Sequence, residues 1–239
     1  MKFKIEGNVF DSGIIAPKVG NLIFEDFSDI KLEDGEEIAN VARDSGFKLV
    51  TLGAEKPVKL SGFTHMGIIR EVEADAENVW ERIKNISNIF NVRSLGNNDW
   101  NHVKELLKIY PSNRYSNDSN LKPEQVIIHK LAILKHLAEQ FPDYSLGLFS
   151  KENELMGFHF LRLFPDTVYL QELLVKPNYR VGFASLQLVK NNLELIIKNT
   201  KTKKLATRVY EDNNISINFF TKLGFGKLRK KEYYYHMWI

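Results

Sequence analysis

The residues of this chain best suited to chemistry lie between 167 and 200, where an apolar strand, a short loop with a glycine and an amphipathic helix follow one another. Pro177 ends the strand, because proline has no N–H to donate to a ladder. In the helix, apolar residues recur three or four positions apart and share one face. A tight loop that enters a helix points unpaired N–H groups and the positive end of the helix dipole at one place. We expect an anion to bind there, most simply a pyrophosphate.

Two motifs in this half of the chain resemble the Gcn5-related N-acetyltransferases (GNAT). The segment LLVKPNYRVGFASLQL is similar to their acyl-CoA-binding segment, in which Val-x-Pro precedes Arg or Gln, two residues, Gly, one residue, and Gly or Ala. Further on, NNIS (213–216) and FFTKLGF (219–225) resemble the last helix of the family and its Lys-Leu-Gly-Phe end. The resemblance covers residues 95–239. It implies a GNAT fold and acetyl-CoA as co-substrate, without a metal.

The chain departs from the family pattern in two places. If Gly182 and Ala184 take the two small-residue positions, Tyr179 stands where Arg or Gln is expected and Arg180 comes one place late. The family often has a tyrosine that protonates the leaving thiolate, and Phe220 occupies that position here. A phenyl ring has no proton to donate, so the acid must lie elsewhere.

The resemblance implies two sets of contacts with acyl-CoA. The loop and the helix start would cradle the diphosphate, while the backbone of the preceding strand and an Asn after the next strand would hold the pantetheine arm. The predicted cofactor-binding residues are Leu173, Leu174, Val175, Arg180, Val181, Gly182, Phe183, Ala184, Asn213 and Phe220. Two alternatives stay open, namely a plain strand-to-helix turn with a surface arginine, and Asn213 as a helix cap.

Acetyl transfer to an amine needs a route for protons off nitrogen and onto sulfur. Glu172 is the only carboxylate in the strand 167–175, and burial where strands separate would raise its pKa and suit it to act as base. The alternative is a solvated residue or the partner of a surface lysine. Tyr210 is the acid candidate nearest in sequence, with the tyrosines at 233–235 and water as alternatives.

The amine acceptor is expected at the loop between the first two helices of the resembling region. The candidates there are Arg114, Tyr115 and Asp118. The segment NRYSNDSNLKPEQVIIHKL and the additional amino-terminal section resemble bacterial GNAT enzymes that acetylate a nucleotide-linked deoxysugar of the TDP-fucosamine type. In that interpretation Arg114 meets a diphosphate and an aromatic ring stacks on a base or sugar. The alternative is a solvent-facing loop in which Arg114 pairs with Asp118.

The resemblance therefore implies an N-acetyltransferase that acts by direct transfer in a ternary complex, since no cysteine is present to carry the acyl group. Its acceptor is predicted to be a primary amine, and the leading candidate is the amino group of a nucleotide-linked deoxysugar. The same chemistry on an amino acid, a peptide or a polyamine is the alternative within enzymes. A degenerate module that binds acyl-CoA without turnover is the alternative outside them.

Composition excludes several other classes. With 33 basic and 30 acidic residues, the net charge of +3 gives no sign of a nucleic-acid or membrane surface. The absence of cysteine rules out disulfides and thiol chemistry, and the six histidines show no metal-site spacing. No apolar run reaches the length of a membrane span, so we expect a cytoplasmic protein. Aromatic residues in the last strand permit a homodimer.

The order of elements predicts an α/β fold with a mixed sheet. The resemblance implies that a smaller section 1–92 precedes a GNAT domain 93–239. The first section is expected to be a reduced unit of the same kind, because helix, Gly-Phe and strand recur in both. We predict helices over 33–44, 99–110, 124–140, 183–199 and 215–223. We predict strands over 21–24, 48–52, 66–72, 144–149, 155–163, 167–175, 204–210 and 232–238.

Overall fold

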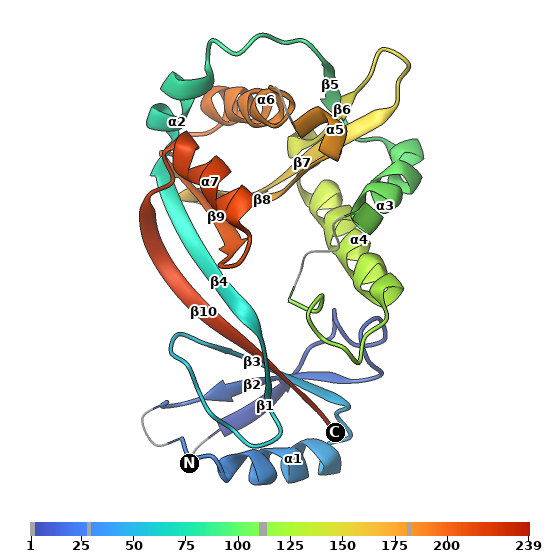
Figure 1. Ribbon diagram of the computed structural model, residues 1–239, viewed down its shortest axis with the longest axis vertical. Helices are drawn as coiled ribbons and strands as arrows, with labels where there is room; N and C mark the ends of the chain where they lie inside the picture. Colours follow the sequence, from blue (N-terminus) through green and yellow to red (C-terminus); the bar gives the residue numbers. More distant parts are fainter. Residues whose placement is uncertain (1–2, 28–29, 110–113, 181–182) are drawn as a thin grey trace.

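The computed structural model describes residues 3–27, 30–109, 114–180 and 183–239, and these form one mixed sheet flanked by helices (Figure 1). The sheet has ten strands in the order β1-β2-β3-β10-β4-β9-β8-β7-β6-β5. The strands are β1 (Phe3–Gly7), β2 (Val19–Phe24), β3 (Leu49–Ala54), β4 (Thr64–Asp75), β5 (Asn91–Ser94), β6 (Ser145–Phe149), β7 (Leu155–Leu163), β8 (Thr167–Val175), β9 (Lys204–Tyr210) and β10 (Lys227–Trp238). The predicted mixed α/β fold is confirmed.

The helices lie on both faces of the sheet. They are α1 (Asp34–Asp44), α2 (Ala76–Ile83), α3 (Trp100–Ile109), α4 (Pro123–Gln140), α5 (Pro177–Arg180), α6 (Ala184–Asn199) and α7 (Asn214–Leu223), with 3-10 turns at Asn97–Asp99 and Pro142–Tyr144. The helices α2, α6 and α7 cover one face and bury an apolar core with β4, β7, β8 and β9. The helices α3 and α4 cover the opposite face over β6, β7 and β8. No described helix is long and apolar enough to cross a membrane.

The two halves of the chain have the same topology around the long β4 and β10 strands. In the first half the antiparallel pair β1/β2 leads through α1 to β3, which is parallel to β2, and then to β4. In the second half the antiparallel pair β7/β8 leads through α6 to β9, which is parallel to β8, and then to β10. Each half gives its last strand to the other, because β10 pairs with β3 and β4 pairs with β9 (Figure 1). The halves are therefore interlocked.

A fragment of residues 93–239 should fail to fold cooperatively. It would lack β4, which lies between β9 and β10, and also α2, whose Val79 and Ile83 are fully buried in the core beneath α6. Losing two such side chains removes about 3–6 kcal/mol of apolar burial, a large part of the stability of a domain. Urea unfolding followed by circular dichroism tests this, with the full chain as control. A sharp transition in the fragment would contradict it.

Most predicted elements are confirmed to within a few residues. Three elements, β1, α2 and β5, were not predicted, and the last two lie largely in the polar passage 77–98, which was predicted to be a boundary. The segment after Pro177 was predicted as a loop, whereas Pro177–Arg180 forms the short helix α5. The last strand begins at Lys227 and not at 232, because its charged first part pairs with β4.

Candidate active site

The strands β8 and β9 run side by side only over their first part. Their parallel pairs extend from Thr167 with Lys204 to Leu170 with Thr207, where the Thr207 hydroxyl donates to the Leu170 carbonyl at 3.0 Å. Beyond this point β8 continues to Val175 and keeps its pairing with β7. The described pairing of β8 with β9 thus ends before the last residues of β8. Leu173, Leu174 and Val175, predicted to hold the cofactor arm, lie in this part.

Glu172 lies directly after a β-bulge in β8. Phe160 of β7 is opposite Glu172 and Leu161 is opposite Leu170, so Gln171 is the additional residue. Leu170 packs in the core beneath α6, whereas the Glu172 carboxylate meets α4 on the other face. There its Oε2 lies 2.9 Å from Nζ of Lys130, a lysine only 6% exposed. Glu172 therefore has a lysine partner, as one alternative held, but that lysine is buried.

Tyr210 ends β9 opposite this part of β8. Its hydroxyl is buried and has no hydrogen-bond partner among the described residues. Burial raises the pKa of Tyr210, and the nearby Tyr234 and Glu172 act in the same direction, while the charges of Arg114 and Arg208 oppose them. The charges of Glu172 and Arg114 thus both act on the Tyr210 phenol. A neutral phenol beside a carboxylate is a suitable acid–base pair.

Arg114, in the loop before α4, is bound to the amino-terminal part of the chain. Its Nη2 contacts Oδ2 of Asp11 and the hydroxyl of Tyr115, and its side chain remains 29% exposed. Tyr115 is fully buried and also donates to Asp11. Burial alone would raise the pKa of Asp11, but the hydrogen bond from His129 and the charge of Arg114 lower it to about 2. Arg114 thus pairs with Asp11 and not with Asp118.

Asp118 belongs to the same loop, and its side chain has no exposed surface. Its Oδ2 accepts a hydrogen bond from Trp238 Nε1 at 2.9 Å and lies 2.7 Å from His236 Nδ1, so the loop is fixed to β10. Burial alone would raise the pKa of Asp118, but the hydrogen bonds from His236 and Trp238 lower it to about 2. Tyr115 and Asp118 therefore support the loop from within the protein, and Arg114 is the member with exposed surface.

The lowered pKa of Asp118 predicts a pH-dependent part of the stability. A carboxylate whose pKa falls from 3.8 to about 2 on folding stabilises the protein above pH 4 and loses this contribution as the pH drops towards 2. Asp118→Asn should lower the free energy of unfolding at pH 6 by on the order of 2 kcal/mol, and the difference from the parent should shrink below pH 4. Urea unfolding at a series of pH values measures it. The exposed Asp212→Asn serves as control, and a difference independent of pH would contradict the prediction.

The start of α6 is the predicted anion site. Val181 and Gly182 lie outside the described residues, and Arg180 is the last residue of α5. Phe183 precedes the helix and is 51% exposed, whereas Ala184 is fully buried against Val175 and Leu188. The first turn of α6 contains no acidic residue, whereas that of α1, its counterpart in the first half, contains three. Of these two helices, α6 is the one compatible with a phosphate.

Asn213 and Phe220 have structural contacts that account for their residue types. The Oδ1 of Asn213 accepts the N–H of Ser216 at 3.1 Å, so Asn213 caps α7 as the alternative interpretation held. Phe220 is 7% exposed and packs edge-to-face against Phe219 and Phe225. Neither arrangement supplies a proton donor for the leaving thiolate, so the acid candidates are still Tyr210, the tyrosines at 233–235 and water.

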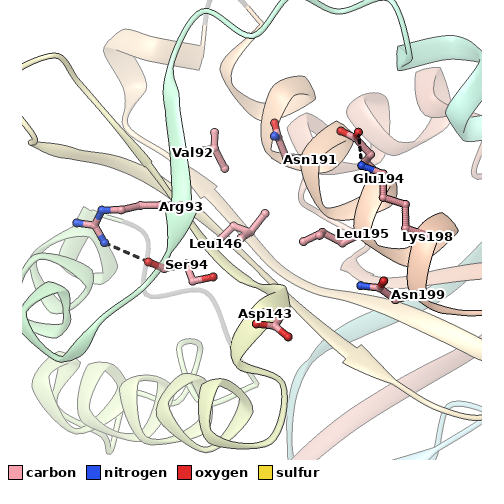
Figure 2. A pocket seen from close by; sticks show the side chains of 10 residues that line it. All are labelled: Val92, Arg93, Ser94, Asp143, Leu146, Asn191, Glu194, Leu195, Lys198 and Asn199. Carbon is pink, nitrogen blue, oxygen red and sulfur yellow. Dashed lines mark hydrogen bonds and ion pairs between the residues drawn. The ribbon is translucent and has the colours of Figure 1, made fainter.

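A separate open cavity of about 410 Å³ lies between β5 and the carboxyl half of α6 (Figure 2). It is lined by Val92, Arg93, Ser94, Asp143, Leu146, Asn191, Glu194, Leu195, Lys198 and Asn199. None of the predicted site residues is among them. The cavity is distinct from the Glu172–Tyr210 site, since Glu172 points to α4 on the other face of the sheet.

Comparison with known proteins identifies the family of the chain. The model of the acetyltransferase (GNAT) family matches residues 103–225, about half of the chain, and this span contains Arg114, Glu172 and Tyr210. The chain belongs to the GNAT acetyltransferase family. GNAT enzymes move an acetyl group from acetyl-CoA to an amine, and this protein is an acetyl-CoA-dependent N-acyltransferase. A search of the curated proteins found no matching sequence.

Several solved structures share the GNAT fold at low sequence identity. A conserved protein of unknown function from Staphylococcus epidermidis superposes with a TM-score of 0.66 at 7% identity, over 92% of this chain and 84% of that one. A tandem GNAT protein of the clavulanic acid biosynthesis pathway gives 0.60 at 12% identity, over 92% and 75% of the two chains. A GNAT from Sphaerobacter thermophilus gives 0.58 at 9% identity, over 99% and 76%. These likenesses extend through the amino-terminal half.

Two residues of this GNAT site were missed by sequence reasoning. Lys130 looked like an ordinary polar residue of an amphipathic helix, and only its burial beside Glu172 distinguishes it. Asp11 lies in a turn after β1, more than 100 positions before Arg114, outside the region matched by the family. No local pattern connects residues so far apart, so the sequence carried no signal for either contact.

Proposed function

We propose that this GNAT enzyme acetylates the primary amine of a nucleotide-linked deoxysugar by direct transfer in a ternary complex. The observation that supports it most is the end of the β8–β9 ladder at Leu170 and Thr207, with Glu172 and Tyr210 beyond it on the two strands. An acceptor that reaches this point meets a carboxylate and a neutral phenol together. The side chain of Arg114 is 29% exposed, and its charge acts on the same phenol.

Each of these residues has a defined role in the proposed reaction. Acetyl-CoA supplies an activated thioester when bound. Glu172 accepts a proton from the amine, directly or through a water molecule, so that a neutral nitrogen can attack. Tyr210 donates its proton to the sulfur of the departing thiolate. Because the chain has no cysteine, the acetyl group passes directly to the acceptor nitrogen.

Arg114 is the residue that favours a nucleotide diphosphate on the acceptor. A guanidinium is planar, permanently charged and able to donate in parallel to two phosphate oxygens. The hydrogen bonds that the structure describes for Arg114 are made by Nη2, to Asp11 and Tyr115, and its guanidinium carbon lies 4.9 Å from the centre of the Tyr115 ring. The remaining N–H groups are those proposed to meet the diphosphate.

We further propose that residues 1–92 are a reduced GNAT-like unit that binds no cofactor of its own. The matching topology of the two halves supports this relation. In the first half, however, the helix start carries Asp34, Glu36 and Glu37, whose charges repel phosphate. Gly35 there lies so close to the Ser61 carbonyl that a Cβ would be 2.0 Å from it, so backbone fills the space. One CoA per chain is expected.

Release of free CoA from acetyl-CoA in the presence of different amines tests the proposal. A TDP-linked amino-deoxysugar should be turned over faster than a free amino acid, a peptide amino terminus or a polyamine. If only the amino acid, the peptide or the polyamine were turned over, the proposed acceptor would be wrong, whereas the proposed chemistry would still hold. Tight binding of CoA without turnover on any amine would instead support a binding module.

A further inference from the structure

Asp11 is a buried carboxylate of the amino-terminal half. It contacts the loop before α4 in the other half, where the acceptor is proposed to bind. It is 2% exposed and receives Arg114 and Tyr115 on Oδ2, while His129 Nε2 lies 2.6 Å from Oδ1. Three side chains of the second half therefore converge on one residue of the first. Such a concentration of contacts on a single carboxylate fixes their relative positions.

Asp11 is itself held in place before it binds these groups. Its backbone N–H donates to Oδ1 of Asn8 at 3.0 Å, and Nδ2 of Asn8 donates to its Oδ2 at 2.6 Å. Asn8 is in turn anchored to the sheet, since its backbone N–H donates to the Val19 carbonyl at 2.8 Å. The carboxylate is thus held in place by the amino-terminal half, independently of the loop that carries Arg114.

A fixed carboxylate restricts the orientation of the arginine that pairs with it. Arg114 has several rotatable bonds, and ordering such a side chain on binding a ligand costs affinity. The Asp11 contact at Nη2 orders it beforehand, while 29% of its side-chain surface stays accessible. The loop that carries Arg114 reaches Tyr210, since a Cβ on Gly67 would lie 3.5 Å from Asn117 Nδ2 and 3.6 Å from the Tyr210 ring. The charge of Arg114 also acts on Tyr210 and on Tyr234.

We propose that Asp11 is a positioning residue for the acceptor site, which holds the Arg114 guanidinium in the orientation that receives a diphosphate. This inference rests on the proposed function, because it takes Arg114 to bind the acceptor. The amino-terminal half then sets the affinity for the acceptor without touching it and has no effect on the affinity for CoA.

Calorimetric binding of thymidine diphosphate and, separately, of CoA tests this in the full chain. Asp11→Asn should weaken thymidine diphosphate binding roughly tenfold, the effect of one charge-assisted contact, and leave CoA binding unchanged. The double variant with Arg114→Ala should bind no more weakly than Arg114→Ala alone, since both remove the same oriented group. Asp99→Asn is the matched control. Asp99 is also buried and pairs with an arginine, Arg93, at 2.7 Å, but lies beside β5.

The outcomes separate the inference from the proposed function. If the parent protein does not bind thymidine diphosphate, the nucleotide-linked acceptor is wrong and the inference falls with it. If the parent binds and Arg114→Ala weakens binding, but Asp11→Asn matches Asp99→Asn, only the role of Asp11 is overturned. Should Asp11→Asn not fold, Asp11→Glu replaces it. This variant keeps the charge and displaces the guanidinium, and unchanged thymidine diphosphate binding by the folded variant overturns the inference.

Discussion

Glu172→Gln should lower kcat by roughly 100-fold or more, the lower end of what a positioned general base contributes. The amide has nearly the shape of the carboxylate but cannot accept the proton of the amine. Glu172 lies beyond the part of β8 that pairs with β9, and its charge acts on Tyr210 at the end of β9. The acceptor and the thioester are proposed to meet there. Because the substitution changes no cofactor contact, the dissociation constant for CoA should stay within about twofold of the parent value.

The control for this variant must also remove a largely buried carboxylate that pairs with a lysine. Glu73 in β4 is a suitable match, since its side chain is 10% exposed and its carboxylate lies 2.7 Å from the ammonium of Lys227. Glu73→Gln should retain activity near the parent level. Thermal unfolding of both variants shows whether removing the partner of the buried Lys130 disturbs the fold. A folded Glu172→Gln protein with parent-like kcat would exclude Glu172 as the base.

Gly182→Val should weaken CoA binding by about 100-fold or more, which corresponds to losing two hydrogen bonds to a charged group. The resemblance of VKPNYRVGFA to the acyl-CoA-binding segment places Gly182 where backbone must approach the diphosphate closely, and a branched side chain would stand in that space. The structure describes the start of α6 beside this residue and finds no acidic group in its first turn. Fluorescence or calorimetric titration with CoA measures the effect.

Gly226→Val provides the comparison for a glycine outside the site. A Cβ at Gly226 meets nothing within 4 Å, and its φ is not in the left-handed region, so the substitution costs little there. CoA binding should be unchanged in that variant. If Gly182→Val also bound CoA like the parent protein, the position of the diphosphate would have to be sought elsewhere.

The secondary structure of the second half was predictable because its signals are local. The strand 204–210 was predicted with the bounds that β9 has, and the α4 and α6 helices begin within one residue of their predicted starts. Apolar periodicity, Pro177 and the capping Asn213 each act within a few residues of the element that they define. The amino-terminal half was less complete, since β1 is half polar and β5 has only four residues.

The candidate site was predictable in part. The sequence predicted Glu172, Tyr210 and Arg114 as site residues, and in the structure the charges of Glu172 and Arg114 act on the Tyr210 phenol. The sequence also predicted Tyr115 and Asp118 as acceptor-site residues, although the structure buries both side chains in the protein interior. Burial of a loop residue depends on what covers it, and the cover comes from β10 and the turn containing Asp11.

The sequence by itself determined the order of elements, the strand-loop-helix that resembles an acyl-CoA segment, and the carboxylate in its strand. The tertiary structure decided the face on which that carboxylate lies. Simple alternation would place Glu172 on the side of Leu170, in the core beneath α6, and the bulge at Gln171 moves it to the side of α4 and Lys130. The register of β8 against β7 sets the bulge, and the interlocking of the two halves sets the Asp11–Arg114 contact. Both depend on partners distant in the chain.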